Sequence, residues 1–144
     1  MNDRKDPYEA ADAFRQLISA TIRDLCHAYL AVSDRGDHDS CVRTLMASRK
    51  ALHDAFGDSP PRPQRKGTGI SGESLRMTLG GIVDAAQKII LMFEAVEETE
   101  TPEGISRWLS TRGRDLTKGL SFLIGDLLCE DNLRKIALKY DTAN

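Results

Sequence analysis

Residues 57–73, GDSPPRPQRKGTGISGE, constrain the fold more than any other stretch of this chain, because they suit neither a helix nor a buried core. Proline removes a backbone donor and glycine weakens regular structure, so this segment divides the chain. On either side, apolar residues recur at steps of three and four, the spacing of an amphipathic helix. The sequence therefore predicts two helical hairpins, over 7–56 and 74–140, joined by a basic connector over 57–73.

Length and composition indicate one globular domain over residues 1–144. The chain is 40% hydrophobic and 29% charged, and its net charge of −2 argues against a surface that binds nucleic acid throughout. Cys26, Cys41 and Cys129 are odd in number and widely spaced, which favours free thiols in a reducing compartment. The charged N-terminus lacks the apolar segment of a signal peptide, and no apolar run reaches the length of a membrane span. A cytoplasmic protein without a membrane partner is expected.

The first hairpin has clear start and stop signals. Asp6 precedes Pro7, and Glu9 follows three residues after Asp6, a pattern typical of a helix N-terminus. An apolar stripe continues from there to Val32, and the polar SDRGD at 33–37 predicts the turn. A second helix is expected to run to about Phe56, with a narrower apolar stripe.

The second hairpin is more apolar. Helical spacing continues from Leu75 to Val96, and IILMF at 89–93 covers the whole circumference of the predicted helix. Thr101-Pro102 predicts a new helix start, and a kink or break is expected near 111–114, where Gly113 follows Gly104 and precedes two further glycines. A short last helix is predicted over 133–140.

These elements predict an all-α fold, an antiparallel four-helix bundle made of two hairpins with a short fifth helix at the C-terminus. Such a bundle covers only part of a helix that is apolar all round. Two explanations remain open for 89–93 and for the apolar residues 120–129: either the third helix lies at the centre of the fold, or the surplus apolar surface is an interface.

The connector carries two pattern matches. Gly67-Thr-Gly69-Ile-Ser-Gly72 fits GxGxxG, and its backbone N–H groups at a helix start would suit a phosphate. The strand that a dinucleotide fold requires is missing from the sequence before this motif. Two alternatives are left: a weaker anion site formed with Arg62, Arg65 and Lys66, or a solvated linker that binds no anion. Residues 60–65 also have the PxxPxR spacing of a polyproline II ligand. The alternative is that these prolines only stiffen the linker.

Charge is arranged in blocks. Residues 43–76 hold seven basic and three acidic side chains, whereas 84–103 hold six acidic side chains and Lys88 alone as a base. Complementary blocks of this kind pair within a bundle or between subunits, although most such runs are solvated faces.

Catalytic and metal-binding patterns are poor. Cys26-His27 and His38-x-x-Cys41 flank the first turn, but a helix rises about 1.5 Å per residue, which places them on different levels. No cofactor or metal is expected. Arg23–His27 and Arg49–His53 would allow a ribonuclease-like helical enzyme only with a pocket and an oriented substrate.

The leading hypothesis is a non-enzymatic interaction or regulatory protein that binds another protein or a second copy of itself. Its expected apolar anchor is Ile90, Leu91, Met92 and Phe93, with Arg62, Arg65 and Lys66 as a basic guide. The alternative is an accessory protein that binds nucleic acid or phosphate through the basic segment 57–76. A ribonuclease-like enzyme is the third option.

Overall fold

The computed structural model describes residues 7–55 and 67–141, in which it contains helices and no strand. The helices are α1 (Pro7–Arg35), α2 (His38–Asp54), α3 (Gly72–Thr99), α4 (Pro102–Trp108), the π-helical turn η1 (Leu109–Gly113), α5 (Arg114–Leu127) and α6 (Asp131–Asp141). The predicted all-α helical bundle is thereby confirmed.

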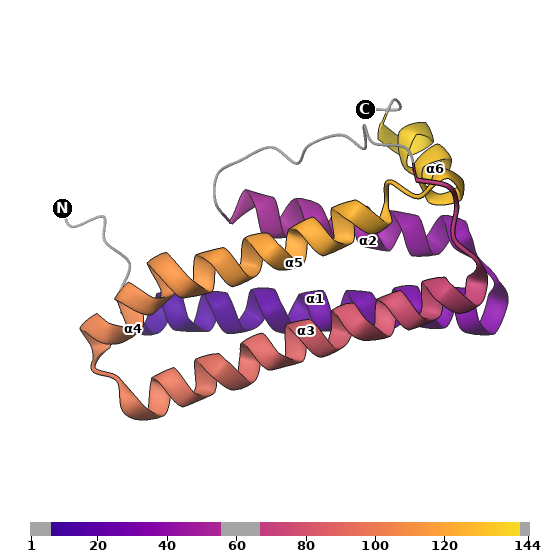
Figure 1. The fold of residues 1–144 in the computed structure, drawn as a ribbon. Helices are drawn as coiled ribbons and strands as arrows, with labels where there is room; N and C mark the ends of the chain where they lie inside the picture. The colour runs from indigo at the N-terminus through magenta and orange to yellow at the C-terminus, as the bar shows by residue number, and fades with distance from the viewer. Residues whose placement is uncertain (1–6, 56–66, 142–144) are drawn as a thin grey trace.

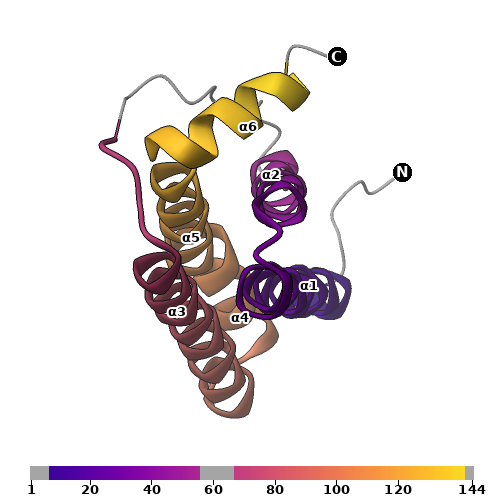
Figure 2. The same cartoon turned by 90° about the vertical axis from the view of Figure 1, so that its right-hand side faces the viewer.

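Four long helical segments surround one core. α1 packs against both α2 and α3, and α5 also packs against both α2 and α3 (Figures 1 and 2). α4, η1 and α5 follow one another without a loop and run back along the bundle antiparallel to α3 (Figure 1). α6 lies across one end of the bundle and packs on α2 (Figure 2). Leu133 and Ala137 of α6 are fully buried, and α2 supplies part of the surface against which α6 packs.

The first hairpin begins and turns where the sequence predicts. α1 starts at Pro7, and Gly36 after its last residue has a φ of 60°, a left-handed conformation that glycine adopts without strain. The N–H of Asp37 then donates to the carbonyl of Ala31 at 2.9 Å. The Asp37 carboxylate accepts the N–H of Ser40 at 3.0 Å and so caps α2.

The predicted interruption near 111–114 is the π-helical turn η1. Its last residue, Gly113, is buried, and a Cβ added there would lie 2.9 Å from Cζ3 of Trp108 and 3.4 Å from Cε1 of Phe14. Only a residue without a side chain lets the two aromatic rings approach the backbone this closely. The interruption is therefore a packing requirement as well as a weak point in the helix.

A small aromatic cluster fills the bundle beside this turn. The ring centroids of Phe14 and Phe93 are 4.9 Å apart, and Trp108 lies 5.6 Å from Phe14 and 5.5 Å from Phe93. Arg15 borders the cluster, with its guanidinium 5.6 Å from the Phe93 ring and an ion pair to Glu97. The hydrogen bond from Arg15 to Glu97 raises the pKa of the guanidinium, which keeps it charged. Phe93 thus connects α3 to α1 and α4.

Candidate interaction surface

The four apolar residues predicted as an anchor lie on different sides of α3. Phe93 is fully buried in the aromatic cluster, and Ile90 and Met92 are partly buried against the main core. Leu91 is 63% exposed. Of the predicted anchor, Leu91 is thus the residue whose side chain is mostly open to a partner, whereas Phe93 stabilises the fold.

Among the described residues, exposed large apolar side chains occur on α3 and its neighbour α5, and others occur on α1. Met77 and Leu91 of α3 are 72% and 63% exposed, and Phe122 and Leu123 of α5 are 70% and 43% exposed. α3 and α5 lie side by side along one edge of the bundle (Figure 2). We call these four residues the α3–α5 surface. Folding leaves Met77, Leu91 and Phe122 mostly in water and Leu123 partly so, and all four are available to stabilise an assembly.

The outer side of α3 has a regular sequence. Six exposed residues follow one another at steps of four, three, four, three and four, which is the spacing of a coiled-coil seam. The six, here named the α3 stripe, are Met77, Gly81, Asp84, Lys88, Leu91 and Ala95. The α3 stripe extends over about 27 Å of helix.

Two features of the α3 stripe are open to a partner. A Cβ added to Gly81, or to Gly80 beside it, would meet no atom within 4 Å, so the backbone forms a shallow notch there. In the described part of the chain, neither Asp84 nor Lys88 takes part in an ion pair. The stripe therefore combines apolar, small and oppositely charged residues, all of which are exposed in the monomer.

Arg62, Arg65 and Lys66, the predicted guide, and the PxxPxR segment 60–65 fall outside the described residues. Three arginines of the basic block over 43–76, Arg43, Arg49 and Arg76, are described. Arg49 is only 6% exposed and lies beside Gly125 of α5, and Arg43 lies 5.7 Å from the ring of Tyr140.

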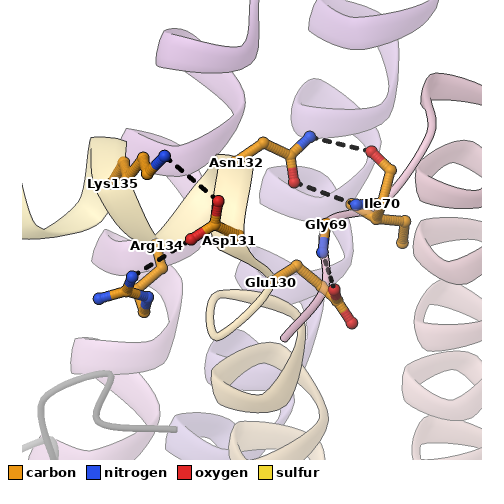
Figure 3. Close-up of polar contacts among 7 residues, drawn as sticks. All are labelled: Gly69, Ile70, Glu130, Asp131, Asn132, Arg134 and Lys135. Carbon is orange, nitrogen blue, oxygen red and sulfur yellow. Dashed lines mark hydrogen bonds and ion pairs between the residues drawn. The ribbon is translucent and has the colours of Figure 1, made fainter. Parts of the chain in front are cut away.

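The glycine-rich C-terminal part of the connector is fastened to the turn between α5 and α6 (Figure 3). The N–H of Gly67 donates to the carbonyl of Cys129 at 2.9 Å, and the N–H of Gly69 donates to Oε2 of Glu130 at 3.0 Å. Asn132 accepts the N–H of Ile70 at 3.1 Å and donates to its carbonyl at 2.9 Å. We call these four hydrogen bonds the clasp.

The clasp bears directly on the phosphate hypothesis. A GxGxxG segment binds an anion through free backbone N–H groups. Here three of those groups already donate to the protein, and one of the acceptors is the carboxylate of Glu130. An added phosphate would have to displace this carboxylate, so the segment is better explained as an internal connection.

The clasp is held on the side of α6 by a local charge cluster. Lys135 and Arg134 contact the carboxylate of Asp131 at 3.3 and 3.2 Å (Figure 3). Their hydrogen bonds, that of Lys135 first, lower the pKa of Asp131. This keeps a negative charge at the first turn of α6, where the helix dipole favours it.

The cysteine and histidine residues do not assemble into a metal site. Cys41 is fully buried, and burial with the nearby charge of Asp37 raises the pKa of its thiol to about 11. Cys26 and His27 are exposed on α1. In residues 7–55 and 67–141, no group of three or more potential metal ligands occurs.

Two depressions lie away from the α3–α5 surface. One, of about 230 Å³, lies beside η1 and has Arg114 as its charged residue, and the other, of about 390 Å³, is a shallow polar hollow that includes Asp24 and Arg43. Neither lining contains a histidine or a cysteine. The first is smaller than the pockets of ~300–1,000 Å³ that usually hold small molecules.

No helix among the described residues is long and apolar enough to cross a bilayer. Comparison of the chain with protein-family models, with curated proteins and with solved structures finds no match.

Proposed function

We propose that this protein works by binding another protein, in the first place a second copy of itself, through the α3–α5 surface. The observation that carries the proposal is the exposure of Met77, Leu91 and Phe122 on two neighbouring helices. Burying a large apolar side chain contributes roughly 1.5–3 kcal/mol. In a symmetric dimer each residue counts twice, so this surface offers a driving force of the size that association must overcome.

The position of the surface also supports the proposal. Phe93, Leu79, Ile82 and Ile89 hold the inner side of α3 in the core. The outer residues are therefore presented on a helix that is already fixed, which lowers the entropy that binding must remove.

A reducing, cytoplasmic setting is part of the same proposal. Cys26, Cys41 and Cys129 are all free thiols, and Cys26 is exposed. Such a thiol persists most readily where disulfides are kept reduced.

The test is the solution mass, measured by light scattering at low and at high salt. We expect a dimer in both, because apolar burial resists salt. Leu91→Asp and Phe122→Asp should each shift the equilibrium toward monomer. Leu30→Asp is the matched control, because Leu30 is 50% exposed but lies on α1, and it should leave the mass unchanged.

Two results would contradict the proposal. One is a wild-type protein that stays monomeric at every concentration. The other is a protein that gains mass only when nucleic acid is added at low salt, because phosphate contacts release counterions and weaken as salt rises. That second result would favour the basic segment 57–76 as the functional part.

A further inference from the structure

We propose that two copies of α3 pack antiparallel along the α3 stripe, about a two-fold axis that passes midway between Asp84 and Lys88. This inference rests on the proposed self-association and adds to it the partner, the helix and the register. The register follows from symmetry. In an antiparallel pair, a two-fold axis places each residue of one copy opposite the residue of the other copy that lies equally far from the axis on its other side.

The charges of the stripe match under this symmetry. Asp84 of one copy faces Lys88 of the other, and Lys88 of the first faces Asp84 of the second. Both side chains are exposed, and neither takes part in an ion pair within the described residues. The arrangement thus gives two opposite-charge contacts at the centre of the interface and no like-charge contact there.

The sizes of the remaining residues match as well. Leu91 of one copy faces Gly81 of the other, where the backbone has open space for a side chain. Met77 faces Ala95 in the same way. Each large side chain therefore meets a small one, which lets two helices approach closely while both large residues are covered.

Two other positions of the two-fold axis along the same stripe are less favourable. An axis through Asp84 would place Met77 on Leu91, but it would also bring the two Asp84 carboxylates together. An axis through Lys88 would bring the two ammonium groups together. Like charges directly opposed are destabilising at an interface, so the register between these residues is preferred.

The acidic residues that follow the stripe are compatible with this register. Glu98 of one copy falls opposite Ser74 of the other, and Glu94 falls opposite Thr78. These acidic residues are all exposed on α3. Glu94 and Glu98 therefore face hydroxyl groups and not another acidic block.

The test uses two single charge reversals, Asp84→Lys and Lys88→Asp, and their mixture. By symmetry each variant alone has two like-charge contacts in this register, and we expect its dimer dissociation constant at low salt to rise about tenfold. In a one-to-one mixture, a heterodimer restores both opposite-charge contacts. Sedimentation equilibrium of the mixture should therefore give a dissociation constant close to the wild-type value.

The mixture separates charge repulsion from misfolding as the cause of the weakening. A variant that is merely misfolded cannot be rescued by a second variant, and circular dichroism of each chain checks its helix content. A mixture of Asp84→Lys with wild-type protein is the register control. If that mixture dimerises more tightly than either chain alone, the axis passes through Asp84 and the proposed register is wrong.

Failure of this inference differs from failure of the proposed function. If wild-type protein dimerises, Leu91→Asp disrupts the dimer, and the mixture of single reversals is not rescued, self-association stands and the antiparallel register is overturned. If wild-type protein is monomeric throughout, both are overturned. Weakening of both single variants together with rescue of their mixture supports the register, provided that Asp84→Lys and wild-type protein form no tighter dimer.

Discussion

The carboxylate of Glu130 accepts a hydrogen bond from the backbone N–H of Gly69, 61 positions earlier in the chain, at 3.0 Å. A glycine-rich segment that resembles an anion cradle thus receives its negative charge from the protein itself. Gly67 shows how close this approach is, since a Cβ added there would lie 2.9 Å from the Cα of Glu130. The segment from Gly67 to Ile70 is consequently a built part of the fold.

The clasp predicts a measurable contribution to stability. Asn132→Ala removes both hydrogen bonds to Ile70 and leaves the N–H of Ile70 without its protein acceptor. We expect the free energy of unfolding, measured with urea, to fall by about 1–2 kcal/mol. Gln16→Ala, at an exposed position on α1, is the control. An equal, negligible effect of both substitutions would show that the clasp contributes nothing.

Two glycines of the helical segment from 109 to 127 should respond to alanine in opposite ways. Gly113→Ala places a methyl group 2.9 Å from Trp108 and should destabilise the protein by about 1–3 kcal/mol. Gly119→Ala meets no atom within 4 Å and should stabilise it by up to about 1 kcal/mol. Thermal unfolding followed by circular dichroism measures both. Equal shifts of the same sign would contradict the packing described around η1.

The buried thiol predicts a loss of stability at alkaline pH. Cys41 in the folded protein keeps its proton up to a pKa of about 11, against an ordinary value of 9.0. Between these values the unfolded chain binds fewer protons than the folded one, so this contribution is complete below about pH 9 and is lost as pH rises through 11. The expected loss is about 2–3 kcal/mol over that interval.

Comparison of unfolding curves for wild-type protein and Cys41→Ala isolates this effect from other groups that titrate in the same range. The Cys41→Ala curve should fall less steeply with pH. Cys26→Ala, which removes an exposed thiol, should retain the wild-type slope. Parallel curves for all three proteins would contradict the prediction.

The notch at Gly81 predicts opposite effects on folding and on association. Gly81→Gln replaces glycine with a good helix former at a position where the monomer has free space, so the dilute monomer should become more stable by somewhat less than 1 kcal/mol. The same side chain occupies the space that receives Leu91 of a second copy, so dimerisation should weaken. Thermal unfolding in dilute solution and sedimentation at higher concentration measure the two effects. A variant that is stabilised and still dimerises like wild type would place the interface elsewhere.

Much of the fold follows from local signals in the sequence. Pro7, Gly36 and Pro102 act on their own backbone or on that of a neighbour, and the helices begin and end beside them. The interruption at Gly113 was also predictable, because several glycines weaken one helix. The reason for Gly113 was not, since Phe14 approaches it from 99 positions away in the sequence.

The surface was harder to predict than the core. Five consecutive apolar residues at 89–93 cover all directions around a helix, so the pattern could not tell that Phe93 points inward and Leu91 outward. Arg49 illustrates the reverse case, because its charge suggested a solvated position and the structure buries it beside Gly125. Burial depends on what the neighbouring helices present, which periodicity does not contain.

The spacing of the α3 stripe is present in the sequence, but its apolar residues alone do not mark it. Two of its six positions are charged and two are glycine or alanine, so its mean hydropathy is unremarkable. The signal is its spacing, since Met77, Asp84 and Leu91 repeat every seven residues. Exposure along α3 had to be known before this repeat could be separated from the inner, core-facing one.

Packing between the two hairpins changes what the covalent connection between them is needed for. Residues from Gly67 onward are fastened to the α5–α6 turn, and α2 packs against both α5 and α6 while α1 packs along α3. The two halves of the molecule therefore contact each other through helix packing, whereas the clasp lies wholly within the second half. Two separate polypeptides divided between residues 55 and 67 should reassemble into the same bundle, which would make this chain a natural scaffold for fragment complementation.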